Sequence, residues 1–587
     1  MPVLQKRMKI RPHPGRILLA VWLLVIFCAG GCRPAVLPPR PLTLVHLNDT
    51  HSHLESSPVS LHIDRQTSTV RLGGFPRIKT FLDRLRAADP ELLLLHGGDA
   101  VQGTLYFSRF KGEVDFDFLN LLGIDALTFG NHEFDLGTGP IAGWIRRSRF
   151  PWLAANIDFS REPEIATLVK PFLIREIHGE KVGIIGLTTS DTPLMTGDVG
   201  RAVFQDVKAA ARREVARLSA LGINRIIVLS HLGYRADLDL AAQVAGIDII
   251  VGGHSHSLLA DREKLRDIGG LTVTGPYPTE VTAPDGNKVL VLQAWEWGHA
   301  LGMVEVSFNA AGAVTAYRGE VTIPVGDSFI RNMTPIPADS DDHRRIVQAL
   351  GKTGILRIIP EDRDMLARLT PYAREISAYR NKAVATARED LVRGINSGPG
   401  PLAADSMLAA FPRTQIALLN CGGVRRDLPA GTISVGDIME VLPFRNSLVL
   451  MELTGAELLA ALEEHIAFTL RRHPERKPPP LPYIAGAAFS VNLNAPAGRR
   501  VFDLSITDAQ GVHRPVEPGA VYRTVVNSFM AGGGDGLQTL KNTGGLRIDT
   551  GILDQEAFGR HLKRLGSFGN PSEQRVKVVF DAGGGDF

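Results

Sequence analysis

Apolar runs that end in polar residues recur through the first half of the chain. Each run has the length and the aliphatic content of a buried strand, and most are followed by Asp, His or Asn. The runs with their loops are LTLVHLNDTHSH (42–53), LLLLHGGD (92–99), ALTFGNHEFD (126–135), KVGIIGLT (181–188), RIIVLSHLG (225–233) and IDIIVGGHSH (247–256). Helical patterns such as VKAAARREVARLSALG (207–222) lie between several of them. This alternation predicts a largely buried sheet with helices on its faces.

The pattern changes in the second half. A polar stretch at 360–389 reads as helical, and it leads into a region with its own mixture of strands and helices. That region contains QIALLNCGGVR (415–425), the amphipathic TGAELLAALEEHIA (454–467) and YRTVVNSFMAGGGDG (522–536). A chain of 587 residues is too long for one hydrophobic core, so we expect two domains.

The charge distribution separates the front of the chain from the rest. The whole chain has a formal net charge of +3, and residues 1–31 hold five Lys and Arg and no acid. The remainder is therefore slightly acidic. A protein that binds polymeric nucleic acid would carry its positive charge through the folded domain, so we expect no nucleic-acid partner.

The front of the chain predicts export. Basic residues up to Arg16 precede the apolar ILLAVWLLVIFCAGG, which is short for a membrane span. Small residues then precede Cys32, as in a bacterial lipobox, so Cys32 would be the acylated first residue of the mature protein. The alternatives are an uncleaved anchor and an ordinary signal peptide with a chance cysteine. The following Pro-rich residues 32–41 suit an extended tether.

The chain has three cysteines, Cys28, Cys32 and Cys421, and the first lies in the predicted signal. A disulfide framework in the mature fold is excluded, as is a zinc site built from thiolates. The other polar residues at the ends of the apolar runs are Asp49, His51, Asp99, Asn131, His132, Asp135, His231, His254 and His256. Each alone is more often a helix cap, a turn residue or a structural histidine. Together they offer oxygen and imidazole ligands, too many for one ion, and predict a pair of divalent metals.

These residues also carry a resemblance. HLNDTHSH, GGD, GNHEFD, SHLG and GGHSH resemble the calcineurin-like metallophosphoesterases, and most of all their branch of 5'-nucleotidases, UDP-sugar hydrolases and 2',3'-cyclic phosphodiesterases. NCGGVR (420–425), VLPF (441–444) and FMAGGGDG (529–536) resemble the nucleotide-binding domain of that branch.

The resemblance implies roles for the polar residues. One metal would be held by Asp49, His51 and His256. The other would be held by Asn131, His231 and His254, with Asp99 bridging the two. The ions could be Zn, Mn, Co, Fe or Mg. His132 and Asp135 fall on the catalytic pair of the family, and a carboxylate that orients a protonated histidine near the phosphate fits that role. Glu133 is interpreted as structural.

The resemblance implies substrate contacts in the second half. Phe444 and Phe529 match two rings that sandwich a nucleobase, although two core phenylalanines would be the simpler interpretation of either residue. The polar contacts to the nucleoside would come from Arg393, Asn420, Arg425 and Asp535. Arg393 is the weakest match, because Asn396 and Pro401 stand where the family commonly has Glu and a Gly-Asn pair.

The predicted fold class is α/β (α+β), with a four-layered α/β/β/α metallophosphoesterase domain and a C-terminal α/β nucleotide-binding domain joined by a helical linker. The predicted boundaries are 1–31 for the signal peptide, 32–41 for the tether, 42–359 for the first domain, 360–382 for the linker helix and 383–587 for the second domain.

The predicted function is removal of the 5'-phosphate from nucleotides outside the cytoplasm for nucleotide scavenging, by an enzyme lipid-anchored in the bacterial cell envelope. A cyclic-nucleotide phosphodiesterase and a UDP-sugar hydrolase are near alternatives. A hydrolase of sulfur esters and a nucleoside-binding lipoprotein without turnover are distant ones. The sequence leaves the oligomeric state open.

Overall fold

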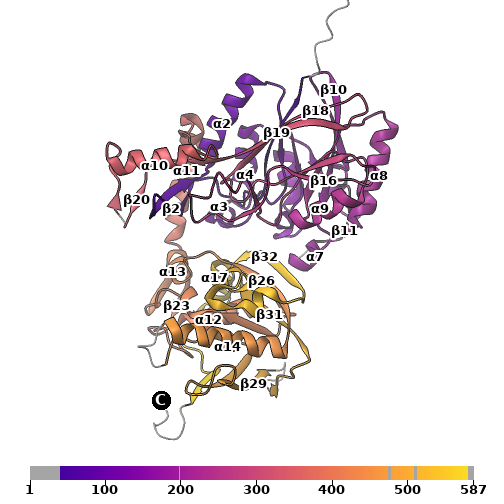
Figure 1. Cartoon of the computed structure of the whole chain (residues 1–587). Helices are drawn as coiled ribbons and strands as arrows, with labels where there is room; N and C mark the ends of the chain where they lie inside the picture. The colour runs from indigo at the N-terminus through magenta and orange to yellow at the C-terminus, as the bar shows by residue number, and fades with distance from the viewer. Residues whose placement is uncertain (1–39, 197–198, 333, 473–477, 508–511, 580–587) are drawn as a thin grey trace, which may run out of the picture. The chain divides into compact units, whose positions relative to one another are not determined.

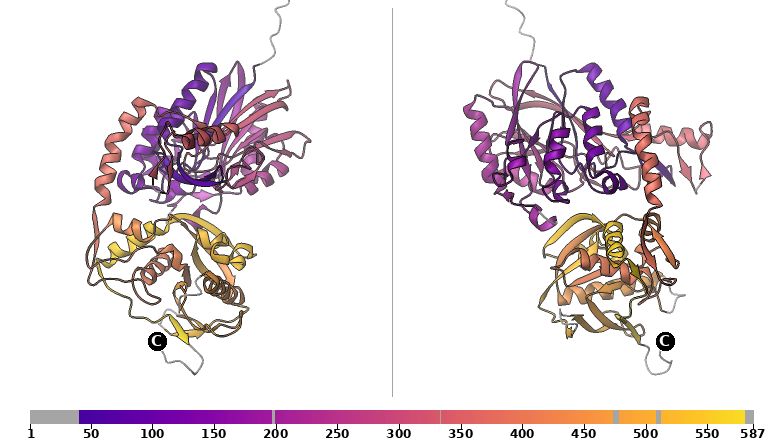
Figure 2. Two further views of the ribbon diagram at one scale, coloured as in Figure 1. Left: turned by 60° about the vertical axis from the view of Figure 1, so that its left-hand side comes forward. Right: turned by 180° about the vertical axis from the view of Figure 1, so that it is seen from behind.

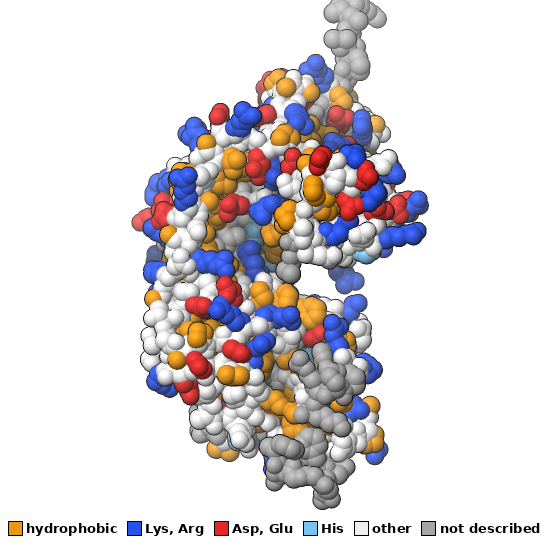
Figure 3. Space-filling model, turned by 90° about the vertical axis from the view of Figure 1, so that its left-hand side faces the viewer, with side chains coloured by type: hydrophobic (Ala, Val, Ile, Leu, Met, Phe, Trp, Pro, Cys, Tyr) orange, Lys and Arg blue, Asp and Glu red, His pale blue; other side chains and the backbone are white. Residues whose placement is uncertain are grey.

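The computed structural model describes residues 40–579 except 197–198, 333, 473–477 and 508–511 (Figure 1). The predicted signal peptide, Cys32 and most of the predicted tether lie outside the described residues. Within the described part of the chain, no helix is both long and apolar enough to cross a membrane. Basic and acidic side chains are interspersed on the face drawn in Figure 3.

The first sheet is built around β1 (Leu42–Leu47), which is parallel to β4 (Leu93–His96) and antiparallel to β18 (Leu301–Phe308). Twelve strands of the described chain belong to this sheet. Beyond the three above, they are β2 (Ser57–Ile63), β3 (Gln66–Leu72), β5 (Ala126–Thr128), β6 (Trp152–Leu153), β8 (Val169–Lys170), β19 (Val314–Val325), β20 (Ile330–Arg331), β21 (Thr334–Pro335) and β22 (Leu356–Ile358).

The second sheet has the order β16-β17-β13-β12-β10-β9 among the described residues. The strands β10, β12, β13 and β17 are parallel, and β9 and β16 pair antiparallel at the two edges. Their bounds are β9 (Phe172–Ile177), β10 (Glu180–Thr188), β12 (Ile226–His231), β13 (Ile249–Val251), β16 (Thr279–Thr282) and β17 (Lys288–Leu292).

The two sheets pack face to face. One apolar core joins Leu44 and Leu95 of the first sheet with Ile184, Leu229 and Leu290 of the second. The outer face of each sheet is covered by helices, which supply the cores on those sides. These helices include α2 (Phe75–Ala88), α4 (Glu113–Leu122), α5 (Ile141–Arg147), α8 (Val207–Ala220) and α9 (Tyr234–Gln243). Figures 1 and 2 show the strands of this domain between the two helical layers, which is the predicted α/β/β/α arrangement.

The six apolar runs form β1, β4, β5, β10, β12 and β13, as predicted. Within each sheet these strands run parallel to one another, so their carboxyl ends meet at one edge. The polar loops that follow them therefore converge.

The predicted linker region contains α11 (Arg363–Arg380), which begins where the Asp362 side chain accepts a hydrogen bond from the Met365 N–H. The expectation of helix as far as residue 389 was wrong, because β23 (Ala383–Ala387) follows at once. This segment pairs with β25 (Gly431–Ser434) and β33 (Ser567–Phe568), and sheet pairing outweighs its alanine-rich helical pattern.

The C-terminal domain contains a mixed sheet of five described strands. In order they are β27 (Tyr483–Ala485), β24 (Ile416–Leu419), β31 (Val521–Asn527), β26 (Ser447–Thr454) and β32 (Arg547–Leu553). One face contributes to a core with α12 (Pro399–Ala410) and α17 (Asp554–Leu565), and the other to a core with α14 (Gly455–Arg472). The second core also includes β28 (Ala487–Asn492) and β29 (Val501–Thr507), which pair with β30 (His513–Pro515) and β34 (Val576–Val579).

Candidate active site

The predicted metal-binding residues lie together at the strand ends of the first domain. Asp49 and His51 follow β1, Asp99 follows β4, and Asn131 follows β5. The histidines come from the second sheet: His231 is the last residue of β12, and His254 and His256 follow β13. Except for the more exposed His254 and His256, these residues are buried.

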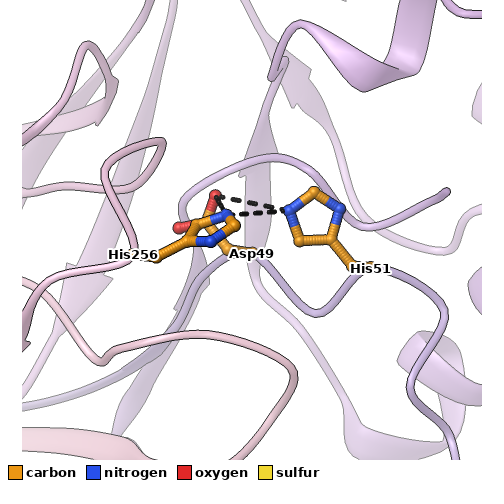
Figure 4. A group of neighbouring side chains, drawn as sticks. All are labelled: Asp49, His51 and His256. Atoms are coloured by element: carbon orange, nitrogen blue, oxygen red, sulfur yellow. Dashed lines mark hydrogen bonds and ion pairs between the residues drawn. The ribbon is translucent and has the colours of Figure 1, made fainter. Parts of the chain in front are cut away.

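The first group consists of Asp49, His51 and His256 (Figure 4). The Nε2 atoms of His51 and His256 lie 3.0 Å apart, and His256 Nε2 lies 3.6 Å from Asp49 Oδ1. Each residue offers one ligand atom, and these atoms lie within 4.8 Å of one another. Two imidazole nitrogens and a carboxylate oxygen at this spacing suit a divalent ion.

The second group consists of Asp99, His231 and His254. His231 Nε2 lies 3.0 Å from Asp99 Oδ2 and 3.3 Å from Asn131 Oδ1. The same Asp99 oxygen lies 3.7 Å from His51 Nε2 in the first group. Asp99 Oδ2 therefore lies between the two groups, within 4 Å of a histidine nitrogen of each.

Two glycines of the sequence motifs make this approach of loops feasible. A Cβ on Gly98 would lie 2.8 Å from His231 Nδ1, and a Cβ on Gly130 would lie 2.0 Å from Asp99 Oδ1. Only glycine leaves room for these ligands at the two positions.

The left-handed backbone conformation is common among these residues. Five of the seven predicted ligands have φ between 47° and 73°: Asp49, His51, Asp99, His254 and His256. This conformation is unusual outside glycine, and at functional sites it aims side chains that an extended chain would point elsewhere.

His132 and Asp135 form a buried pair beside the ligands. His132 Nδ1 donates a hydrogen bond to Asp135 Oδ2 at 2.8 Å, and the His132 backbone N–H donates to Asp99 Oδ1 at 3.0 Å. Burial lowers the pKa of His132, but the carboxylates of Asp135 and Asp99 outweigh it and raise this pKa to about 10. The Asp135 carboxylate thus favours the protonated form of His132.

Glu133 has a structural role, in line with its interpretation from the sequence. It is fully buried and accepts hydrogen bonds from the backbone N–H groups of Asp99, Ala100 and Gly130, at 3.1, 2.8 and 2.6 Å. It thus joins the loops after β4 and β5, which carry Asp99 and Asn131.

Two residues near the centre were missed by sequence reasoning. Asn48 donates from Nδ2 to Asp49 Oδ2 at 2.7 Å. Glu296 lies 2.6 Å from His256 Nδ1 through its Oε2 atom. Asn48 precedes a predicted ligand and could have been found from that position, whereas Glu296 lies forty residues beyond His256 with no pattern to mark it.

The predicted substrate residues line one cavity of the C-terminal domain, of about 1290 Å³. All six contribute to its wall: Arg393, Asn420, Arg425, Phe444, Phe529 and Asp535. Phe444 and Phe529 are 55% and 45% exposed, which does not fit two core phenylalanines. The Arg425 guanidinium lies over the Phe444 ring, 5.6 Å from its centre.

A chain of side-chain hydrogen bonds fixes the polar wall of this cavity. Asn527 Nδ2 donates to Asn420 Oδ1 at 2.9 Å, and Asn420 Nδ2 donates to Asp535 Oδ2 at the same distance. Sequence reasoning missed Asn527 and also Phe468, which lines the cavity from α14. An amphipathic helix pattern alone does not reveal which residue near the end of its buried face borders a cavity.

Arg393 is held by Asp427. Its backbone N–H and its Nε donate to Asp427 Oδ1 at 2.9 and 2.8 Å. The two departures from the family pattern are accommodated locally. The Asn396 side chain binds the backbone of Val576, and Pro401 lies in the first turn of α12, where no intrahelical N–H is needed.

Two family models match the chain. The model described as calcineurin-like phosphoesterase matches residues 42–258, and the model described as 5'-nucleotidase, C-terminal domain, matches residues 381–542. The first range holds the metal-binding groups, and the second holds all the residues that line the cavity.

Whole-chain comparisons agree. A protein of Treponema pallidum described as "Probable 5'-nucleotidase" is 31% identical over 94% of this chain and 97% of its own length. The structure of Haemophilus influenzae NAD nucleotidase is 27% identical over 92% of this chain and 99% of its own, with a TM-score of 0.83. A 5'-nucleotidase precursor from Thermus thermophilus is 39% identical over the same shares, with a TM-score of 0.56. The chain therefore belongs to the 5'-nucleotidase family of calcineurin-like phosphoesterases and is a metal-dependent phosphoester hydrolase.

Proposed function

We propose that this enzyme uses two divalent ions to remove the 5'-phosphate from nucleotides outside the cytoplasm, as a step in nucleotide scavenging. The observation that carries the proposal is that two half-exposed rings and four polar side chains line one cavity. A planar base stacked between Phe444 and Phe529 would leave its ribose hydroxyls to the Asp535 carboxylate, which Asn420 already orients.

The first domain supplies the chemistry. The groups around Asp49 and around His231 would hold the two ions, with Asp99 between them. When bound, such ions neutralise phosphate charge and provide an activated water for attack on phosphorus.

His132 acts on the same phosphate. Its Nδ1–H is committed to Asp135, so Nε2–H is the group that can face the substrate. From there it stabilises negative charge on the phosphoryl group and can protonate the departing 5'-oxygen.

A substrate panel on purified enzyme tests the proposal. AMP, UMP, ATP, UDP-glucose and 2',3'-cyclic AMP would each be assayed with Mn²⁺, Co²⁺ or Zn²⁺, with the His132→Asn variant as a blank for contaminating hydrolases. We expect the highest kcat/KM for a nucleoside 5'-monophosphate. A preference for the cyclic ester or the sugar nucleotide would replace this proposal with the corresponding alternative, and binding without turnover would contradict it.

A dinucleotide is the second candidate substrate. The comparison structure with the TM-score of 0.83 is described as an NAD nucleotidase. The cavity of about 1290 Å³ also exceeds the roughly 300–1,000 Å³ of ordinary small-molecule sites, which leaves room beyond one nucleoside. NAD added to the same panel decides this, because cleavage of its pyrophosphate would release AMP and nicotinamide mononucleotide.

The proposed location is the bacterial cell envelope, with the protein anchored through acylated Cys32. It is supported by the basic and apolar residues before Cys32 and by the small residues directly preceding it. Cys32→Ser should move the protein from the membrane fraction to the soluble fraction, and Cys421→Ser serves as the control. Mass spectrometry that finds an unmodified N-terminus other than Cys32 would reject the anchor.

A further inference from the structure

The Glu296 carboxylate lies against a predicted metal ligand on the side away from the metal position. Its Oε2 is 2.6 Å from His256 Nδ1, whereas His256 Nε2 faces Asp49 and His51. The Glu296 side chain is only 19% exposed. The ring of His256 thus has a carboxylate on one nitrogen and the first metal-binding group on the other.

The segment that carries Glu296 is bonded to the loop of the first ligand. The Ala294 N–H donates to Asn48 Oδ1 at 2.7 Å, and Asn48 Nδ2 donates to the Trp295 carbonyl at 2.6 Å. The Trp297 N–H donates to the Asp49 carbonyl, also at 2.6 Å. These bonds fix the backbone on both sides of Glu296 relative to Asp49.

The backbone of this segment adopts an unusual conformation at both neighbours of Glu296. Trp295 and Trp297 each have a φ of 58°, in the left-handed region that tryptophan rarely occupies. Such conformations persist where the surrounding contacts impose them and where they direct a functional side chain. Here the side chain between them reaches His256.

His51, His231 and His256, three of the four predicted histidine ligands, differ in what holds their outer nitrogen. His231 Nδ1 donates to the Gly97 carbonyl at 2.7 Å, and His51 Nδ1 has no hydrogen-bond partner among the described residues. His256 alone of these three is held by a carboxylate. An acceptor at Nδ1 places the ring proton there and leaves the Nε2 lone pair free for a metal.

We infer that Glu296 is a positioning residue that holds His256 in its metal-binding orientation and tautomer and so strengthens binding of the ion at Asp49, His51 and His256. The inference rests on the proposed two-metal centre. It assigns a selective effect: the ion near His256 depends on Glu296, and the ion near His231 and His254 does not.

Metal titration of the purified full-length enzyme tests this. Glu296→Ala and Glu296→Gln would be compared with the wild type and with Glu263→Ala, which removes a 74% exposed carboxylate of the same domain. Metal content after dialysis, affinity by competition with a chelator, and the visible absorption of the Co²⁺-loaded protein would be measured. Circular dichroism would verify the fold of each variant.

We expect two ions per wild-type chain and per Glu263→Ala chain. Glu296→Ala should lower the binding affinity for one ion by about 10–100-fold and leave the affinity for the other unchanged. It should also change the absorption spectrum of the Co²⁺-loaded protein. Glu296→Gln should lose less of this affinity, because its amide oxygen still accepts a hydrogen bond from His256 Nδ1. This variant supplies the test if Glu296→Ala does not fold.

Two results would overturn the inference, and they are distinguishable. If the wild type binds two ions and both Glu296 variants titrate like Glu263→Ala, the role of Glu296 is refuted while the metal centre stands. If the wild type itself binds fewer than two ions, the proposed two-metal centre is refuted, and this inference with it.

Discussion

His132 is held from two directions, by Asp135 at its Nδ1 and by Asp99 at its backbone N–H. The ring is therefore fixed without being a metal ligand in the proposed arrangement. His132→Asn should lower kcat for AMP by roughly 10²–10⁴, because a group that donates a proton or stabilises charge is lost. Metal content should remain near that of the wild type.

The control for this variant is His62→Asn, which changes an exposed histidine on β2 of the same domain. It should leave kcat unchanged. Loss of an ion in His132→Asn, measured by metal analysis, would instead make His132 a ligand.

One oxygen of Asp99 lies 3.0 Å from His231 Nε2 and 3.7 Å from His51 Nε2, and in the proposed centre it would contact both ions. Asp99→Asn should therefore weaken both ions, by at least the roughly 10–100-fold that loss of an outer partner costs. Metal analysis and AMP hydrolysis would show this, with the exposed Asp239→Asn as the control.

Chelators should abolish wild-type activity reversibly, and a chelated enzyme that still hydrolyses AMP at the full rate would contradict a metal mechanism.

At this scale the sequence identified residues that follow buried strands, because strand ends converge in a layered fold. The structure brings those residues together as Asp49, His51 and His256 and as Asp99, His231 and His254, and a third group of His51, Asp99 and His132 joins these two. The sequence could not indicate Glu296 or Asn527, because each acts through contacts between segments that are far apart in the chain. Glu133 belongs to a motif that the sequence identified. Its three backbone hydrogen-bond donors come from two loops, and only the folded structure shows that these loops lie close together.

At the scale of elements, α4 carries a carboxylate on its buried face. Asp115 is almost fully buried, and burial raises its pKa to about 7 from its ordinary value of 3.8. The folded state therefore favours protonated Asp115. This contribution to stability is present at low pH and is lost as the pH rises through 3.8 toward 7.

Asp115→Asn removes this dependence while keeping the size of the side chain. The melting temperature of Asp115→Asn minus that of the wild type should be larger at pH 8 than at pH 4.5. Thermal unfolding followed by circular dichroism measures this shift. An equal difference at the two pH values would mean that the pKa of Asp115 is not raised in the folded enzyme. The exposed Asp239→Asn is the control, because it shows the effect of removing a carboxylate that is not buried.

Elements were predictable where apolar periodicity is strong, as in α8 and the central strands. The sequence predicted helix beyond Arg380, where α11 ends, and this error has a physical cause. The residues of β23 form a strand only because they pair with β25 and β33. Those partners lie about 50 and 180 residues away in the sequence, beyond the reach of local propensity.

At the scale of the whole molecule, the metal ligands come from residues before 260 and the cavity residues from after 390. In the proposed function, a nucleotide would engage both sets, and binding energy from the base would position the phosphate for hydrolysis. Phe444→Ala combined with Phe529→Ala should lower kcat/KM for AMP by roughly 10–10²-fold, from the loss of stacking. Hydrolysis of p-nitrophenyl phosphate should hardly change.

The matched control is Phe502→Ala, which removes another exposed phenylalanine of the C-terminal domain that does not line the cavity. Phe502→Ala should leave the hydrolysis of AMP and of p-nitrophenyl phosphate unchanged. If the double variant loses both activities equally, the two rings support the fold, and the nucleotide assignment loses its main structural argument.

The left-handed ligands make this enzyme subject to a stability–activity trade-off. Each non-glycine residue in that conformation costs about 1–2 kcal/mol, so a glycine at such a position relieves backbone strain. Asp49, with a φ of 50°, illustrates the conflict. Asp49→Gly and Asp49→Ala both delete a ligand, yet the metal-free glycine variant should melt at the higher temperature, the reverse of the usual order. Selection for heat resistance alone would therefore tend to erode the catalytic centre.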